Sequence, residues 1–389
     1  MCRTKRIAVS KYTIATMSAP VALANNFGNV EIRIPIYVFN KAGFRYGDSV
    51  DVVFSNGYAY HDIPYYNSFI GPARQPCLYG FEYAYTYIGV GYPVTGNPWE
   101  ESRLKPGDTA RVFLNRRGKY LAESKLYSLN LQVLHLPGKD DAWRGNQRGL
   151  ALPGGESTAF FRSASPIRQD THCLLPASKC LEAARPGFVL NLSDNADMLQ
   201  QSCAENPQLP YAQLFREGKV EPLQLGIDFT STAYAQTLVR GLEALICHQP
   251  PYLLHCKYGL DRTGFVCIVL EALAGTSLDS IGHDYMQSYC CIYGLIRGSM
   301  RYQANKLRRL GEMLSYLCGL VGASESVTQE NIQLGAIAYL LKGGMSDDSI
   351  VKLSQLLASG APGAAPAGGA GTVAGASAAS GSVEATVSA

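Results

Sequence analysis

The sequence lacks any apolar stretch long and uncharged enough to cross a membrane, and no transmembrane segment is predicted. Its 11 cysteines are odd in number and irregularly spaced, which excludes a disulfide framework and a zinc-binding pattern. The net charge of +3 is close to zero and no basic face is clustered, so nucleic acid is not an expected partner. We therefore expect no metal, no cofactor and no nucleic acid.

What is present is an ordinary globular composition, 47% hydrophobic and 17% charged, in a chain long enough for two domains. Cysteines without disulfide spacing favour a reducing, cytoplasmic setting. A secreted protein is the alternative, because Arg3, Lys5 and Arg6 precede an apolar run that ends in Val-Ala-Leu-Ala, as in a signal peptide. Lys11 interrupts that run, and we interpret residues 1–25 as a flexible leader.

Residues 26–125 have the period-two pattern of β-strands. Apolar residues from Val30 to Val38 alternate with Glu31 and Arg33, and two later runs of the same kind each follow a Gly-Asp turn. The pattern predicts a small antiparallel β-barrel or sandwich domain. Nine tyrosines lie between residues 58 and 92. Strand alternation explains most of them, and an aromatic surface that contacts a ligand or partner is the alternative.

Residues 255–264 read His-Cys-Lys-Tyr-Gly-Leu-Asp-Arg-Thr-Gly, and they carry the parts of a phosphate-ester hydrolysis site. Apolar segments on both sides predict a strand, a loop and a helix, whose first amides and positive dipole end would favour an anion at Cys256. A thiol is a poor nucleophile near neutral pH because its ordinary pKa is about 8.5, so this setting would hold the thiolate. The alternative is a buried, inert cysteine, which the residues around Cys256 count against.

The neighbours of Cys256 each have an expected role. Gly259 lets the loop curl without a clashing Cβ. Arg262 offers a planar fork that matches two phosphoryl oxygens. Thr263 is expected to donate its hydroxyl to the sulfur, and His255 to fix backbone carbonyls beside the loop. The remaining members of the phosphate-binding loop are Lys257, which adds positive charge at the rim, Tyr258 at the pocket mouth, Leu260 and Asp261.

This decapeptide resembles the signature loop of cysteine-dependent protein tyrosine phosphatases. Its Asp-Arg-Thr-Gly ending is most similar to the atypical branch that includes bacterial tyrosine, dual-specificity and lipid phosphatases. Residues 161–166 are similar to the segment that opens this branch, and residues 284–289 to its helix after the loop. The resemblance implies an α/β catalytic domain over residues 126–322, with a mostly parallel central sheet flanked by helices. It also implies a phosphocysteine intermediate and a phosphorylated protein or small phosphate ester as substrate.

The N-terminal part has a resemblance of its own. Gly28-Asn29-Val30 and the run Ala-Gly-Phe-Arg-Tyr-Gly-Asp at residues 42–48 resemble the C-terminal barrel of the S-adenosylmethionine hydroxide adenosyltransferases. The domain that supplies much of that family's active site is not represented in these residues. The resemblance therefore implies the barrel fold and not the activity.

Hydrolysis of a phosphate monoester needs a proton for the departing oxygen. The resemblance implies a carboxylic acid upstream of the cysteine, and Asp228 fits, although an aspartate there also suits a helix N-terminus. Asp261 is the alternative candidate, since members of this branch carry an aspartate in the loop that acts as a general acid or base. Asp194 and Asp197, which follow a strand-like run, are weaker candidates and are typical turn residues.

After the catalytic region, two apolar helical stripes around Gly343-Gly344 predict a helical hairpin over residues 323–358. Residues 359–389, mainly Ala, Gly, Ser and Pro, predict a disordered tail.

The leading interpretation of the whole chain is a protein tyrosine or dual-specificity phosphatase. A phosphoinositide or inositol-phosphate phosphatase is an alternative, which Lys257 supports and Leu260 opposes, because such members carry a second lysine there. The other alternative is a non-catalytic protein that binds phosphorylated ligands. An intact Cys256 and Arg262 count against it.

Overall fold

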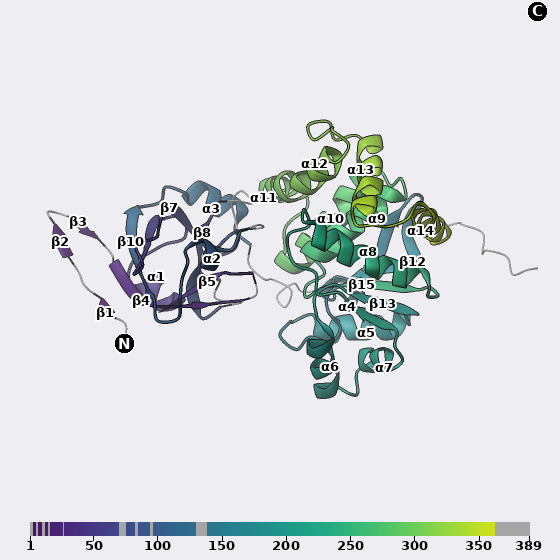
Figure 1. Ribbon diagram of the computed structural model, residues 1–389, viewed down its shortest axis with the longest axis horizontal. Helices are drawn as coiled ribbons and strands as arrows, with labels where there is room; N and C mark the ends of the chain where they lie inside the picture. The colour runs from purple at the N-terminus through teal and green to yellow at the C-terminus, as the bar shows by residue number, and fades with distance from the viewer. Residues whose placement is uncertain are drawn as a thin grey trace, which may run out of the picture.

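The computed structural model describes residues 3–4, 7–9, 12–14, 16–25, 27–69, 75–81, 85–93, 96–129 and 138–361 of the chain. Figure 1 shows a strand-rich N-terminal part beside a larger part in which helices surround a sheet. The predicted disordered tail, residues 359–389, lies outside the described residues from residue 362 onward, and its first residue ends a helix.

The N-terminal part is a closed barrel of seven strands. Its strands follow the order β4-β10-β6-β7-β8-β9-β5, and β5 pairs back with β4 to close the ring. All of these pairs are antiparallel except β7 with β8. The strands are β4 (Thr16–Leu23), β5 (Val30–Pro35), β6 (Ser49–Phe54), β7 (Ala59–Tyr66), β8 (Cys77–Tyr79), β9 (Tyr87–Gly91) and β10 (Thr109–Arg116). The predicted small β-domain is confirmed as a barrel.

Two boundaries of this part differ from the prediction. Strand β4 lies inside the predicted leader, so the barrel begins earlier than residue 26. The predicted strand from Val30 ends at Pro35, and Ile36–Lys41 form the helix α1. Proline explains this change, because it cannot donate to the strand ladder and its fixed φ suits a helix start.

Short elements complete the N-terminal part. Strand β1 (Arg3–Thr4) extends the sheet beside β4, and β2 (Ile7–Val9) pairs with β3 (Tyr12–Ile14). Two short helices follow, α2 (Pro98–Glu101) and α3 (Leu121–Tyr127).

The C-terminal part contains a five-stranded sheet of order β11-β12-β15-β13-β14. The hairpin of β11 and β12 is antiparallel, and the other neighbours are parallel, which confirms the predicted mostly parallel sheet. Strand β15 lies in the middle, and all four of its residues are buried. The strands are β11 (Arg148–Leu152), β12 (Gly155–Ser163), β13 (Phe188–Asn191), β14 (Val220–Pro222) and β15 (Tyr252–His255).

Helices cover both faces of this sheet (Figure 1). On one face Leu253 of β15 packs with α5, α6 and α7. On the other face Tyr252 and Leu254 pack with α8 and α9, and α9 is buried from Thr263 to Leu273. The helices are α4 (Asp141–Arg144), α5 (Leu174–Ala184), α6 (Ala196–Glu205), α7 (Pro210–Arg216), α8 (Thr232–Ile246), α9 (Asp261–Leu273), α10 (Leu278–Tyr293), α11 (Met300–Asn305), the π-helix η2 (Lys306–Leu310), α12 (Gly311–Gly319), α13 (Gln329–Lys342) and α14 (Asp347–Ser359).

The two apolar stripes near the C-terminus form α13 and α14, which pack into the same core as α8 and α9. At the end of α14 the carbonyl of Gly360 accepts hydrogen bonds from Ser157 Oγ at 2.9 Å and from Thr158 N at 3.3 Å. This fastens the end of the described chain to the start of β12. None of the helices in the described ranges is both long and apolar enough to cross a membrane.

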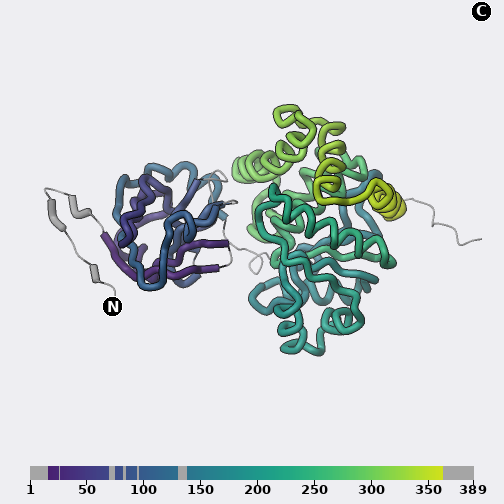
Figure 2. Tube along the Cα trace, in the orientation of Figure 1, coloured from purple at the N-terminus to yellow at the C-terminus, as the bar shows by residue number. Residues whose placement is uncertain are grey.

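The two parts touch near α3 and α11, as the chain trace in Figure 2 shows. Arg309 of η2 is half-buried and donates to the carbonyl of Phe69 at 2.5 Å. The guanidinium of Arg308 lies 4.9 Å from the ring centre of Tyr127. The barrel is thus held against the C-terminal part by arginine side chains.

Candidate active site

The decapeptide 255–264 lies where the central strand β15 ends and the buried helix α9 begins. The first helical bond runs from Gly264 N to the carbonyl of Leu260 at 2.7 Å. Cys256 is 4% exposed and therefore lies at the bottom of the loop rather than on its rim. An anion at this place faces the amides at the positive end of α9.

Loop carbonyls point outward, away from the centre of the loop. Asn146 Nδ2 donates to the carbonyls of Tyr258 at 3.0 Å and Gly259 at 3.1 Å. Arg162 Nη2 donates to the same Gly259 carbonyl at 2.9 Å. Because the C=O and N–H of a peptide plane point in opposite directions, the amides that follow these carbonyls face the loop centre. Such a ring of amides is a binding site for phosphate.

Gly259 is required by this backbone. Its φ is +66°, in the region that glycine adopts without strain. A Cβ built there would lie 2.3 Å from the carbonyl oxygen of Ser163 and 2.8 Å from the nitrogen of Ala164. The close approach of the loop to the end of β12 therefore leaves no room for a side chain.

A buried network of charges supports the loop from behind. Asp284 of α10 pairs with the guanidinium of Arg162, which is fully buried, and with Arg148 Nε at 2.5 Å. Burial alone would raise the pKa of Asp284, but Arg148 and Arg162 outweigh it and hold that pKa below its ordinary value. Burial, together with Asp284, raises the pKa of Glu271 well above its ordinary value and so favours its neutral form. Two guanidinium groups, of Arg148 and Arg162, share the one carboxylate of Asp284 behind the loop, which favours an anion inside it.

His255 is a neutral supporting residue. Its Nε2 lies 2.7 Å from the hydroxyl of Tyr211 on α7, so its partner there is a side chain and not the expected backbone carbonyl. Burial lowers the pKa of His255 to about 4. A neutral, buried imidazole bound to Tyr211 is suited to fixing the end of β15 rather than to moving protons.

Two loop residues keep hydrogen-bonding capacity toward a ligand. The buried hydroxyl of Thr263 has no partner among the described residues, so the predicted hydrogen bond to the sulfur is not formed. Arg262 is half-buried, and its Nη1 donates to the carbonyl of Leu225 at 3.3 Å. A guanidinium has five N–H donors, so this single long bond leaves the fork available to phosphoryl oxygens.

The positive charge at the rim is partly cancelled by a residue that sequence reasoning missed. Lys257 Nζ lies 2.8 Å from Asp170 Oδ2, and the guanidinium of Arg168 donates hydrogen bonds to both oxygens of the same carboxylate. The bonds to Arg168 hold the pKa of Asp170 well below its ordinary value. Arg168 also pairs with the buried Asp194 at 2.9 Å, so that candidate acid is engaged elsewhere. Asp197 lies exposed in the first turn of α6.

The two leading candidate acids lie on the same side of the loop. Asp228 is half-buried and accepts hydrogen bonds from Thr230 N at 3.0 Å and Thr230 Oγ1 at 2.5 Å. It lines a cavity of about 350 Å³. Asp261 is exposed in the first turn of α9 and lines a neighbouring pocket of about 210 Å³ together with Arg262. Both remain candidates for the acid.

Tyr234 of α8 stands between these two hollows and lines both. Its hydroxyl is buried and has no partner in the part of the chain that is described. Burial raises the pKa of Tyr234, so the hydroxyl keeps its proton, and the charges that act on it are those of Arg262, Cys256 and Asp261. The sequence pattern places Tyr234 on the apolar face of a helix, and nothing in that pattern distinguishes it from a core residue.

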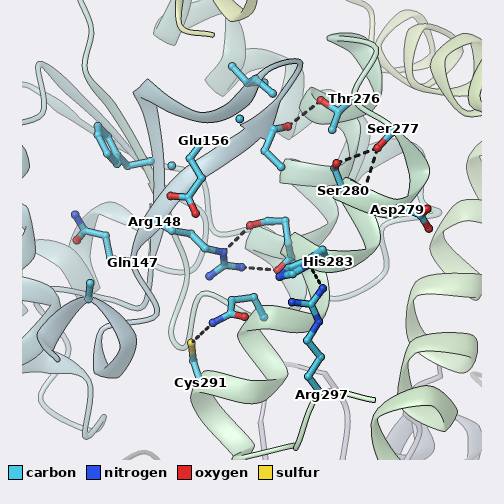
Figure 3. A pocket seen from close by; sticks show the side chains of 18 of the residues that line it. Gln147, Arg148, Glu156, Thr276, Ser277, Asp279, Ser280, His283, Cys291 and Arg297 are labelled. Carbon is cyan, nitrogen blue, oxygen red and sulfur yellow. Dashed lines mark hydrogen bonds and ion pairs between the residues drawn. The ribbon is translucent and has the colours of Figure 1, made fainter. Parts of the chain in front are cut away.

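A larger cavity of about 1520 Å³ lies between β11, β12 and α10 (Figure 3). Its labelled side chains include Arg148, Glu156, His283 and Cys291, and among the residues that line it none belongs to the loop 255–264. Burial raises the pKa of Cys291 to about 11, so this thiol is protonated at neutral pH. The cavity therefore has no thiolate nucleophile.

The loop lies inside a region of the chain that matches a known family. Residues 211–358 match the model of the tyrosine phosphatase family. No curated protein matches the chain. One similar solved structure is an uncharacterized conserved protein from Thermotoga maritima, with 16% identity and a TM-score of 0.22, over 28% of this chain and 38% of that one. Another is the core catalytic domain of the PP-IP phosphatase SIW14 from S. cerevisiae in complex with citrate, with 19% identity and a TM-score of 0.24, over 41% of this chain and 89% of that one.

Proposed function

We propose that the protein is a protein tyrosine or dual-specificity phosphatase that works through a phosphocysteine, since residues 211–358, which contain the loop, match the model of the tyrosine phosphatase family. The observation that supports this most is the loop itself, with Cys256 at its base, carbonyls turned outward and Arg262 at its far end. That arrangement places a sulfur nucleophile beneath a phosphate-sized ring of amide donors.

In the first step the Cys256 sulfur attacks phosphorus in line with the ester oxygen. The S–P bond forms as the P–O bond breaks, and an acid gives its proton to the departing oxygen. The loop amides and the Arg262 fork hold the non-bridging oxygens, whose charge grows in the transition state. The hydroxyls of Thr263 and Tyr234, both buried without a partner among the described residues, are further donors beside this centre.

In the second step water attacks the phosphocysteine. The S–P bond breaks, the sulfur leaves as the thiolate, and the water proton passes to the carboxylate that acted as acid in the first step. Phosphate then departs, and the loop returns to its starting state. The positive charge behind the loop, from Arg148 and Arg162 against Asp284, stabilises the thiolate in both steps.

Asp228 is the proposed acid. Asp228→Ala should lower kcat for an alkyl phosphate by about 10²- to 10³-fold, because a poor leaving group needs the proton. The loss on 4-nitrophenyl phosphate, whose leaving group needs little protonation, should be less than about tenfold. The control is Asp197→Ala, an exposed aspartate on α6 that should change neither rate. Equal losses on both substrates, or none, would transfer the acid role to Asp261.

Phosphoinositides and inositol phosphates suit the site less well. The rim lysine Lys257 is paired with Asp170, and Leu260 is a buried core residue, 3% exposed. Additional phosphate groups would therefore meet little unpaired positive charge at the rim.

The test of the function is a phosphate-release panel on the full chain. We expect the highest kcat/KM on a phosphotyrosine peptide, lower values on a phosphoserine peptide, a phosphoinositide and an inositol phosphate, and complete inhibition by vanadate. Fastest release from an inositol phosphate would establish the alternative substrate class. Binding of the phosphopeptide without any release would identify a non-catalytic binding protein.

A further inference from the structure

The pocket of about 210 Å³ at the catalytic loop is formed by both parts of the chain. From the C-terminal part it is lined by Leu260, Asp261 and Arg262 of the loop, and by Tyr234. From the barrel it is lined by five aromatic side chains, which we call the aromatic wall: Phe27, Phe69, Phe81, Tyr85 and Tyr92. The barrel thus closes a hollow that opens onto the catalytic arginine.

The aromatic wall is a packed surface rather than a set of loose side chains. The rings of Phe69 and Phe81 meet edge to face with centres 4.8 Å apart, and Phe81 and Tyr85 do so at 5.5 Å. Arg309, which also lines the pocket, donates to the carbonyl of Phe69 and so helps to fix the position of the wall. Edge and face contacts of this kind are available to a further ring that enters the pocket.

The C-terminal part of the chain also contributes aromatic side chains to the pocket, in addition to the loop residues. Phe229 and Phe265 stack with centres 4.5 Å apart, and Tyr234 meets Phe265 edge to face at 6.0 Å. Tyr234 and Arg262 line the same pocket. The pocket therefore combines the phosphate-binding arginine of the loop with aromatic rings from both parts of the chain.

Size and charge limit what this pocket accepts. Its volume is below the ~300 Å³ at which pockets begin to hold drug-sized molecules, so it suits a group of about one ring. Its charged lining residues are two acids, Asp261 and Glu312, and two arginines, Arg262 and Arg309. A balanced lining gives no advantage to a group that carries several negative charges.

We propose that the aromatic wall of the barrel receives the ring of an aryl phosphate while Arg262 holds its phosphoryl group, so that the N-terminal domain selects phosphotyrosine-like substrates. This inference rests on the proposed function, because it assigns the organic part of the substrate to a subsite next to the catalytic loop. The barrel is then a specificity-determining part of the enzyme.

The test uses Phe27, which is 38% exposed and lines both this pocket and the cavity beside Asp228. Phe27→Ala should lower kcat/KM for phenyl phosphate about three- to tenfold, mainly through KM, because one ring contact is lost. The value for glycerol 2-phosphate, which has no ring, should stay unchanged. Because each variant is compared with the unaltered chain on the same substrate, the different reactivity of the two esters cancels.

The matched control is Tyr37→Ala, an aromatic residue of the barrel that is 69% exposed and does not line the pocket. It should leave kcat/KM unchanged for both substrates. Inhibition by inorganic phosphate should also be the same in both variants as in the unaltered chain. The double variant Phe27→Ala with Tyr85→Ala should extend the loss on phenyl phosphate beyond tenfold. Unchanged kcat/KM on phenyl phosphate, or equal losses on both esters, would overturn the inference. No phosphate release from either ester by the unaltered chain would instead refute the proposed function.

Discussion

Replacement of Cys256 by serine is expected to abolish phosphate release while leaving the binding of a phosphorylated ligand intact. A serine hydroxyl is a far weaker nucleophile than a thiolate, and the loss should be on the order of 10⁴-fold or more, the scale seen when an enzyme loses its covalent nucleophile. Binding should persist because the amides of the loop and Arg262 do not depend on the sulfur. Phosphate release measured together with binding of a phosphotyrosine peptide checks both halves of this expectation.

Two of the other cysteines, Cys173 and Cys203, are unsuited to replace Cys256 as nucleophile. Burial raises the pKa of Cys173 to about 12 and that of Cys203 to about 11, so both thiols are protonated at neutral pH. The control is Cys247→Ser, an exposed cysteine at the end of α8, which should keep full activity. Turnover retained in Cys256→Ser would refute the phosphocysteine mechanism.

Replacement of Asp284 by alanine is expected to give the largest loss of stability. It would leave the guanidinium of Arg162 and that of Arg148 without their shared carboxylate, and an unpaired buried charge costs about 3–5 kcal/mol. For a domain of this size that corresponds to a fall in melting temperature of about 10 °C. Thermal and urea unfolding of the full chain measure the effect.

The matched control for this change is Asp279→Ala, an exposed aspartate in the first turn of the same helix α10. It should cost less than about 1 kcal/mol, the usual contribution of an acid at a helix start. Asp284→Ala should also slow catalysis, since Arg162 holds the Gly259 carbonyl outward. Unfolding of Asp284→Ala at the same temperature as the unaltered chain would show that the buried network does not support the fold.

The spacing of apolar residues predicted secondary structure well in segments where a single helical or strand periodicity runs without interruption. The alternation from Val30 to Ile34 became β5, and the apolar run after Arg262 became α9. Strand β4 was not predicted, because it follows a basic stretch that has the composition of a leader, and one of its two main partners, β10, lies far along the chain. Pairing between distant strands is not encoded in the spacing of either strand alone.

The chemistry of the loop was predictable from ten consecutive residues, but its support was not. Asn146 and Asp170 contact the loop from segments that the fold brings together, and Arg148 holds Asn146 in place; no spacing relates any of them to Cys256. Arg162 and Asp284 belong to segments whose resemblance was visible in the sequence, yet their pairing requires α10 to lie against β12. The place of the aromatic wall depends in turn on contacts between the two parts of the chain.

The hydrogen bond between Gly360 and Ser157 determines where a label attached after the last described residue lies relative to the phosphate loop. Ser157 lies near the start of β12, whereas Ser163 at the other end of that strand is level with His255. A tether or dye joined after residue 361 would therefore approach the edge of the sheet remote from the phosphate loop. Protein immobilised through that end would present its pocket to the solution, which makes this the preferred attachment point for surface-based measurements of ligand binding.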